Sequence, residues 1–198
     1  MRLPRSEHTS RPWRIHELTR DFRVEDVWAL PTPGDRGDFP ALVRGATALE
    51  TSESASRTVR ALFALRWKLG EIFGWDEEDA GVGGRVATLR DRLPPDLRGT
   101  APEAGSSLPF EPLYLLEDEY AAEIANRTVH GVMHLGWVPR PEGGYRGQMA
   151  VLVKRNGPFG AAYMSVIAPF RYLIVYPTMI REIEREWPQR LAQHQGAG

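Results

Sequence analysis

Cysteine is absent from this chain of 198 residues. Its absence excludes disulfide bonds, thiolate nucleophiles, cysteine-based zinc sites and iron–sulfur clusters. Lysine is scarce as well, because only Lys68 and Lys154 occur and arginine carries nearly all of the positive charge. This bias indicates a GC-rich genome rather than a function.

The chain also lacks an excess of charge and a long apolar run. The formal net charge is -1, and acidic and basic residues are interspersed, so we expect no basic face that would bind nucleic acid. No run of eighteen apolar residues occurs, and the first residues do not form a secretory signal. We therefore expect a soluble, cytoplasmic protein with no membrane span.

Several catalytic and cofactor motifs are missing. No GxGxxG follows a strand pattern, and the segment GVGG at residues 81–84 is too short and falls in a predicted loop. No GxSxG nucleophile elbow and no HExxH zinc motif occurs. We expect neither a cofactor nor a metal.

Length and composition predict one domain over residues 1–198. With 42% hydrophobic residues the chain can bury a sizeable core. Residues 77–109 are rich in Gly, Pro and acidic side chains, which predicts a surface excursion, partly mobile or folded as a lid. A linker between two domains is the alternative for this segment.

In the N-terminal half we predict an extended segment at 12–18. A short helix follows, capped by Asp21 and stopped by Pro31. The segment from Phe39 to Arg44 can form another helical turn. Residues 56–73 carry apolar side chains at helical spacing before Gly74, which predicts a long helix.

The C-terminal half has the pattern of a sheet followed by a helix. A short apolar run covers 113–116, and residues 145–155 alternate apolar and polar side chains like a strand. The turn sequence RNGPFG then leads to a second strand at 161–168, so the two strands form a hairpin. A long amphipathic helix begins at Pro169 and is expected to kink at Pro177. Its apolar stripe consists of Phe170, Leu173, Ile174, Pro177, Ile180, Ile183, Trp187 and Leu191.

His130 and His134 have a spacing that would suit a metal site on a helix. The segment 128–138 favours a strand, however, because Thr, Val and Trp are frequent there and Gly131 is poor in a helix. Residues four apart on a strand share a face but lie about 13 Å apart, too far to share one ion. The two histidines then belong either to the solvated side of the sheet or to the polar part of a cavity.

The segments LFALRWKLGEIFGWD (62–76), VLVKRNGPFGAAYMSVIAPF (151–170) and the following RYLIVYP resemble a bacterial family of domains of unknown function, the DUF2867 family. The resemblance extends over 59–183 and fails at 77–109. Members occur alone or fused behind NAD(P)-binding domains. The family is itself similar to the helix-grip superfamily of START domains and polyketide cyclases. This resemblance implies an α+β fold in which a curved antiparallel sheet wraps around a long C-terminal helix and leaves a cavity.

Three functions remain open on these grounds. In the first, the protein is a module that binds a hydrophobic small molecule in that cavity, with Tyr163, Arg171 or a histidine at its polar end. Alternatively, it is a cyclase or isomerase, in which His130 or His134 acts as general acid or base and Arg171 or Arg66 stabilises an oxyanion. The third possibility is a structural partner domain, and the oligomeric state stays open. The predicted ligand-binding residues are Arg66, His130, His134, Met149, Tyr163, Phe170, Arg171 and Ile174.

Overall fold

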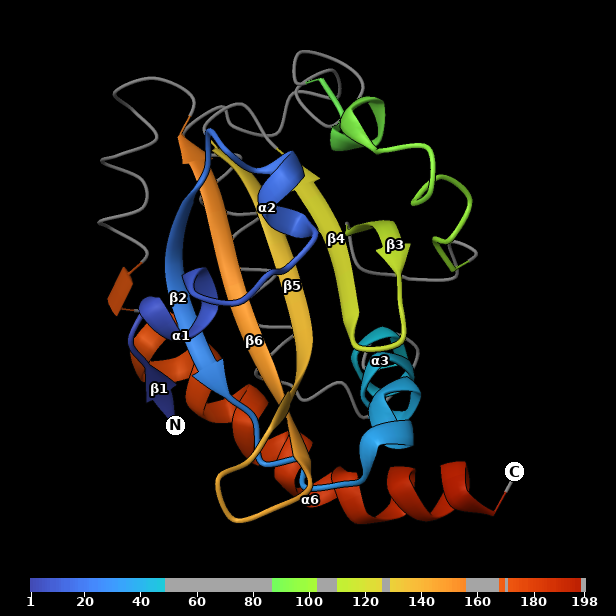
Figure 1. Cartoon of the computed structure of the whole chain (residues 1–198). Coiled ribbons are helices and arrows are strands. Elements are labelled where there is room, and N and C mark those ends of the chain that lie inside the picture. Colours follow the sequence, from blue (N-terminus) through green and yellow to red (C-terminus); the bar gives the residue numbers. More distant parts are fainter. Residues whose placement is uncertain (49–86, 103–109, 126–128, 156–167, 170, 197–198) are drawn as a thin grey trace.

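The protein folds around one six-stranded antiparallel sheet (Figure 1). The computed structural model describes residues 1–48, 87–102, 110–125, 129–155, 168–169 and 171–196. The strand order is β1-β2-β6-β5-β4-β3, so the sheet is open and has β1 and β3 at its edges. The strands are β1 (Arg2–Leu3), β2 (Arg23–Ala29), β3 (Glu111–Leu115), β4 (Glu119–Ala125), β5 (Val129–Pro139) and β6 (Tyr145–Arg155).

The β5–β6 hairpin forms the centre of the sheet. Both strands have eleven residues, and the register runs from Val129 opposite Arg155 to Pro139 opposite Tyr145. The loop between them contains Gly143 and Gly144, whose positive φ angles of 97° and 70° suit glycine in a tight turn. The predicted strand at 145–155 is confirmed, and so is the strand that carries both histidines, within the residues described.

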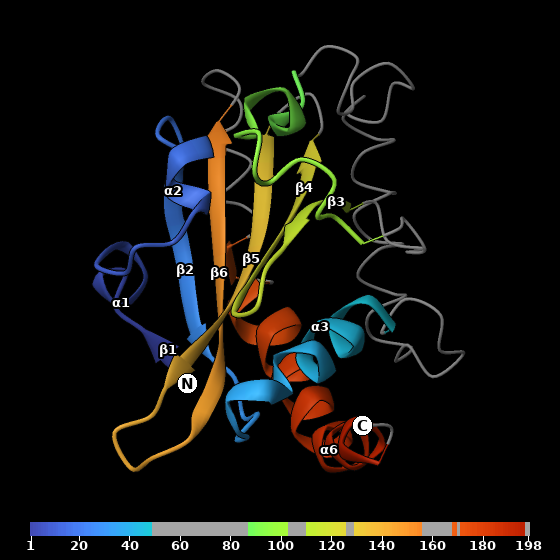
Figure 2. The same ribbon diagram turned by 45° about the vertical axis from the view of Figure 1, so that its right-hand side comes forward.

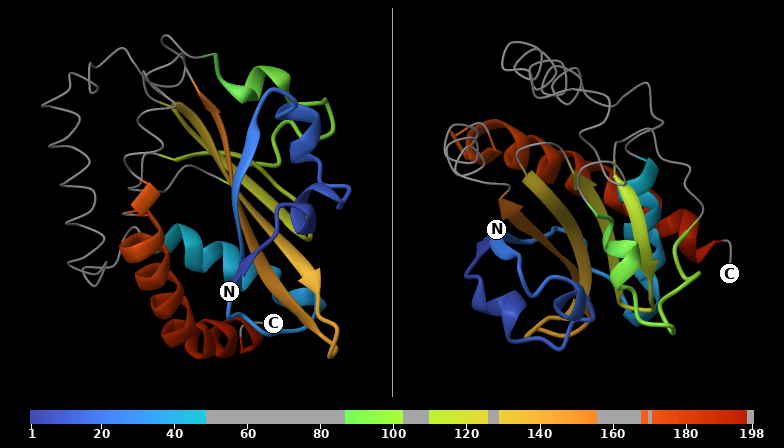
Figure 3. Two further views of the ribbon diagram at one scale, coloured as in Figure 1. Left: turned by 90° about the vertical axis from the view of Figure 1, so that its left-hand side faces the viewer. Right: turned by 90° about the horizontal axis from the view of Figure 1, so that it is seen from above.

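The two faces of the sheet are covered by different parts of the chain. One face carries α1 (Ser6–Thr9), α2 (Ile15–Leu18) and the short 3₁₀ helix η2 (Leu89–Arg92). The opposite face carries α3 (Phe39–Ala48), which follows η1 (Arg36–Asp38), and the C-terminal helix α6 (Tyr176–Gln195). Figure 2 and the view from above in Figure 3 show this separation. We call the first side the N-terminal face and the second the helix face.

Alternation along the strands distributes the side chains between these faces. On β5, Val132 and Val138 pack in the core of the N-terminal face, while Leu135 and Trp137 pack in the core of the helix face. Each face therefore has its own hydrophobic core. The described structure is of the α+β class, as expected from the sequence.

The C-terminal helix departs from α geometry just before Pro177. Residues Arg171–Val175 form a π-helical turn, η3, and α6 then begins with Pro177 in its first turn. A π turn rotates the side chains that precede it relative to those that follow. This explains why Leu173 and Ile174 of the predicted stripe are exposed while Trp187 is buried.

Two N-terminal predictions are wrong. Residues 23–29, predicted as a helix capped by Asp21, form the strand β2, because β6 offers a pairing partner that periodicity cannot reveal. Residues 15–18, predicted as extended, form the helix α2. The helical turn expected at Phe39 is confirmed by α3.

Some predicted elements lie outside the described residues. These are the helix at 56–73 and nearly all of the strand at 161–168. The predicted hairpin of 145–155 with that strand is wrong, because β6 pairs with β2 on one side and with β5 on the other. Within the segment 77–109, residues 87–102 are described, and Leu89, Leu93 and Leu97 are buried in the core of the N-terminal face. None of the helices described is long and apolar enough to cross a bilayer.

Gly136 allows the N-terminal segment to pack tightly against β5. A Cβ atom at this position would lie 2.6 Å from Cζ2 of the Trp13 ring. We expect Gly136→Ala to lower the free energy of unfolding by about 1–3 kcal/mol, because the ring would have to move. Urea unfolding measures this change. Gly37→Ala is the matched control, because its Cβ would meet no atom within 4 Å; equal effects of both substitutions would contradict the packing argument.

Candidate functional site

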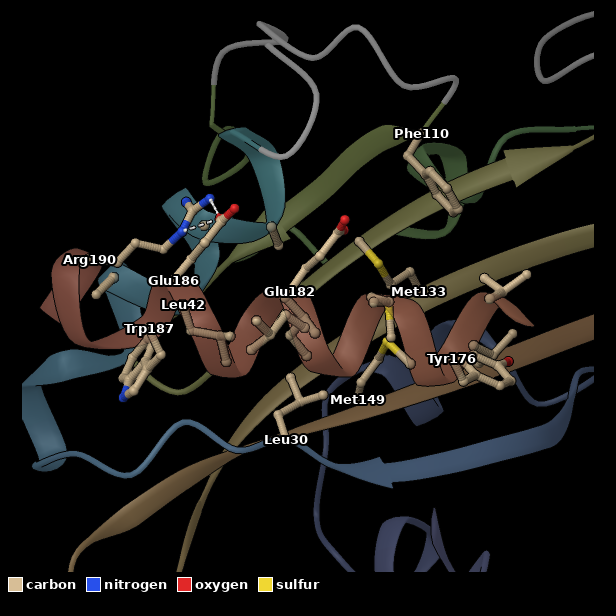
Figure 4. Close-up of a pocket in the computed structure, with 18 of the residues that line it drawn as sticks. Leu30, Leu42, Phe110, Met133, Met149, Tyr176, Glu182, Glu186, Trp187 and Arg190 are labelled. Atoms are coloured by element: carbon tan, nitrogen blue, oxygen red, sulfur yellow. Dashed lines mark hydrogen bonds and ion pairs between the residues drawn. The ribbon is translucent and has the colours of Figure 1, made fainter. Parts of the chain in front are cut away.

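An apolar pocket lies between the sheet and the helices of the helix face (Figure 4). Its volume is about 310 Å³. β5 and β6 contribute Met133, Leu135 and Met149 to one wall, and α3 contributes Leu42 and Ala46 to another. The third wall is α6, with Tyr176, Met179, Ile183 and Trp187. A concave apolar pocket of this size is a candidate ligand site.

Three charged side chains of α6 are part of the pocket lining. They are Glu182, Glu186 and Arg190, at intervals of four residues. Arg190 donates from Nη2 and Nε to Oε2 of Glu186, over 2.6 Å and 3.2 Å. Glu182 is buried, with 7% of its surface exposed. The polar part of this pocket therefore comes from α6.

A buried carboxylate fixes the start of α6 at one end of the pocket. Tyr176, which lines the pocket, donates its hydroxyl proton to Asp26 Oδ2 of β2 over 2.8 Å. Tyr172 donates to the other oxygen of the same carboxylate. Burial, followed by the charge of Asp26, raises the pKa of Tyr176, so this hydroxyl stays protonated and remains a donor. Arg171 Nη2 lies 3.4 Å from Asp26 Oδ2.

The N-terminal face contains a buried histidine and glutamate arrangement. On β4, Glu119 accepts hydrogen bonds from the backbone N–H groups of Arg14 and Ile15, both 2.9 Å, at the start of α2. The Tyr114 hydroxyl donates to Oε1 of Glu119 over 2.5 Å. His134 Nε2 lies 3.0 Å from the same oxygen. Glu119 thus caps a short helix and orients a histidine at once.

Glu123, four residues further along β4, forms a similar arrangement. It accepts from the backbone N–H of Leu89 at the start of η2, with Oε2 3.0 Å away, and from the Thr88 hydroxyl. His130 Nε2 lies 2.7 Å from Oε2 of Glu123. In both cases, the histidine on β5 pairs with a glutamate two residues along β4 from its own cross-strand neighbour.

The two carboxylates have lowered pKa values. Burial raises the pKa of each, but hydrogen bonds and charge outweigh it. For Glu119 the opposing groups are His134, Tyr114 and the Arg14 N–H. For Glu123 they are His130, Thr88 and the Leu89 N–H. Both glutamates are therefore ionised in the folded state at neutral pH.

His8 of α1 completes the arrangement from above the sheet. Its Nε2 lies 3.2 Å from Nδ1 of His134, and its ring is fully buried. Burial, followed by the neighbouring His134, His16 and Arg11, lowers the pKa of His8 to about 2. The His8 ring is therefore neutral at physiological pH.

A second pocket, of about 440 Å³, lies beside this arrangement. Glu119 and Trp13 are among its lining residues, and so are Arg11, Arg36 and Asp118. Burial and the neighbouring Glu119 raise the pKa of Asp118. This pocket is polar, in contrast to the pocket on the helix face.

The structure separates the residues predicted from the sequence as one site. Met149 lines the apolar pocket. His130 and His134 share a face of β5, as predicted, but it is the N-terminal face, where both are buried rather than solvated. Arg171 lies beside Asp26, and Ile174 is 38% exposed and is not among the described lining residues. Arg66, Tyr163 and Phe170 lie outside the described residues.

Several residues of both sites were not predicted. Glu182 was missed because a glutamate beside an apolar helical stripe is typical of a solvated face. Glu119 and Glu123 had a usable signal, since their spacing of four residues on one strand matches that of His130 and His134 on the next. His8 had no such signal, because only the tertiary fold brings α1 over β5.

Metal binding has no geometric support in the part of the chain that the structure describes. No group of three or more His, Asp or Glu side chains there could hold an ion. The absence of a functional metal stays a prediction from the sequence.

We expect acid to destabilise the fold through His8. The unfolded His8 binds a proton below about pH 6.5, whereas the folded ring stays neutral down to about 2. Within this window, His8 alone makes the free energy of unfolding fall by up to about 1.4 kcal/mol for each pH unit of acidification. Chemical unfolding of wild type and His8→Phe at pH 5–8 measures the difference.

His8→Phe removes this titration, so its stability should fall less steeply between pH 6 and pH 5 than that of the wild type. At pH 8 the ring is neutral in both states, so measurements there give the cost of the substitution that does not depend on titration, including the lost contact with His134. Parallel pH profiles of the two proteins would contradict the neutral state of His8.

Glu123→Gln is expected to lower the free energy of unfolding by about 1.5–3 kcal/mol, because hydrogen bonds to a buried charged acceptor are lost. Glu111→Gln on the neighbouring strand is the control, since Glu111 is exposed. Denaturant unfolding at pH 7 compares the two variants. A loss of the same size in both would show that the buried contacts of Glu123 contribute nothing specific.

Comparison with known proteins identifies a family. The model of a family described as "Protein of unknown function (DUF2867)" matches residues 18–178, from the end of α2 into the first turn of α6. No curated protein and no solved structure gives a match. The matched segment includes the strands β2 to β6, whereas His8 and the part of α6 that carries Glu182, Glu186 and Arg190 lie outside it. Because it covers most of the sequence, the chain belongs to the DUF2867 family.

Proposed function

We propose that the protein binds a hydrophobic small molecule in the apolar pocket of the helix face. The observation that carries this proposal is the pocket itself, about 310 Å³ of space within the core around Leu135, Met149 and Trp187. Ligand sites are typically apolar cavities of this kind with a few polar groups that fix orientation. Here Glu182, Glu186 and Arg190 are the charged groups in the described lining.

The arrangement of elements also supports the proposal. A long C-terminal helix lies across one face of an antiparallel sheet, and the pocket lies between them (Figure 4). This is the order and the placement that the helix-grip resemblance implies. As part of the proposal, the fold is a helix-grip-like one whose pocket corresponds to the cavity of that superfamily.

The pocket wall consists of side chains that can adjust to a ligand. Met133 and Met149 come from the sheet and Met179 from α6, and methionine adapts its shape at low cost. Removing about 300 Å² of apolar ligand surface from water would contribute about 7.5 kcal/mol, at about 25 cal/mol per Å². Association costs roughly 4 kcal/mol or more, so apolar burial of this extent alone supports weak binding, on the order of millimolar.

The enzymatic alternative has one observation in its favour. Glu119 is hydrogen-bonded to His134 and also lines the second pocket. An enzyme of the cyclase or isomerase type would place its acid and base there, on the N-terminal face. The two proposals thus use different faces of the sheet, and we favour ligand binding because the helix-face pocket is the apolar one.

Filling the pocket tests the proposal. N-Phenyl-1-naphthylamine, an uncharged probe that fluoresces in apolar surroundings, should bind the wild type with a saturable rise in fluorescence. Ala46→Phe projects a ring from α3 into the pocket and should weaken binding at least tenfold. Ala192→Phe, the same change at an exposed position of α6, is the control and should bind like the wild type.

Two outcomes would refute ligand binding at this site. The first is a wild type that does not enhance the fluorescence of the probe. The second is equal binding by both phenylalanine variants and the wild type, provided that circular dichroism shows all three to be folded.

A further inference from the structure

Glu182 is a largely buried acid with no partner among the residues that the structure describes. Only 7% of its surface is exposed, and it lines the apolar pocket from α6. It forms no hydrogen bond or ion pair with any part of the chain that the structure describes. Burying a carboxylate in apolar surroundings is costly unless a donor or a cation compensates it. The carboxylate oxygens of Glu182 are not among the fully buried atoms, so they are accessible from the pocket, and no described residue donates to them.

The neighbouring arginine does not supply the missing partner. Arg190 lies two turns further along α6 and is bound to Glu186 through both Nη2 and Nε. The charged side chains of the described lining are therefore two carboxylates and one guanidinium, and a single negative charge remains unbalanced. That charge belongs to Glu182.

The position of Glu182 suits the head group of an elongated ligand. Figure 4 shows its carboxylate between the Glu186–Arg190 pair and Met133. The rest of the described lining around it is apolar, including Met149, Ile183 and Phe110. A molecule with an apolar body and one polar end could fill the pocket and place that end at Glu182.

We propose that the ligand of this pocket is an amphiphilic amine whose protonated nitrogen binds the carboxylate of Glu182. This inference rests on the proposed function and adds the chemical class of the ligand. A protonated amine supplies both the donors and the positive charge that Glu182 lacks. An alcohol would supply a donor only, and a carboxylate ligand would be repelled.

Three probes with the same chain and different head groups test the proposal. Decylamine, decanol and decanoate are titrated calorimetrically at pH 7 into wild type, Glu182→Gln and Glu184→Gln. The wild type should bind decylamine about 10- to 100-fold more tightly than decanol, the range of a hydrogen bond to a charged group, and decanoate most weakly. Glu182→Gln should abolish the preference for the amine. Glu184→Gln removes an exposed carboxylate from the same helix and should keep it.

The outcomes distinguish this inference from the proposed function. If decylamine and decanol bind the wild type equally, or if Glu182→Gln keeps the preference, the amine inference fails and the apolar pocket stands. If only the uncharged naphthylamine probe binds, the amine inference fails as well. If neither that probe nor any of the three chains binds, both proposals fail.

Thermal unfolding without ligand gives an independent measurement. Glu182→Gln should unfold at the same or a higher temperature than the wild type, because an uncompensated charge is removed. Residues kept for binding commonly cost stability in this way. A clear fall in the unfolding temperature would show that Glu182 has a stabilising partner within the protein, and it would overturn the inference.

Discussion

Two buried carboxylates of β4 hold the covering segments of the N-terminal face onto the sheet. Glu119 accepts from the backbone at the start of α2, and Glu123 does the same at the start of η2. These helices have only four residues each, too short to be stable alone. The hydrogen bonds from strand to helix, with the apolar contacts of Ile15, Leu18 and Leu89, therefore keep this face closed.

The buried polar groups of the N-terminal face are only partly satisfied. Glu119 and Glu123 accept several hydrogen bonds, and the β5 histidines orient these carboxylates, whereas His8 Nδ1 and Trp13 Nε1 are buried without a hydrogen-bond partner. The helix face is different, since Asp26 anchors only the start of α6 and the pocket lies further along the helix. The sheet thus separates a side with hydrogen-bonded carboxylates and a polar pocket from a side with an apolar pocket.

The buried carboxylates of the two faces differ in their hydrogen-bond donors. Glu119 and Glu123 each have several donors, which is the pattern of groups that stabilise a fold. Glu182 has the same chemistry but no donor among the described residues, and its oxygens are accessible from the pocket, which is the arrangement that the proposed ligand would use. His130 and His134 are engaged with the glutamates of β4 on the N-terminal face, whereas the apolar pocket lies on the helix face.

The sequence by itself determined the strands β5 and β6, the long C-terminal helix and the α+β class. These elements follow from local periodicity, which one segment of chain carries alone. It also determined that His130 and His134 share a face, because the strand period is two. Only the tertiary structure decided that residues 23–29 are a strand, since pairing with β6 outweighs their helical capping signal. It likewise decided which face is covered by which segment, because His8, Glu119 and His134 are up to 126 residues apart in sequence. Periodicity places Glu182 on the same face of α6 as Met179 and Glu186, but only the packing of α6 on the sheet decided that this face borders an apolar pocket.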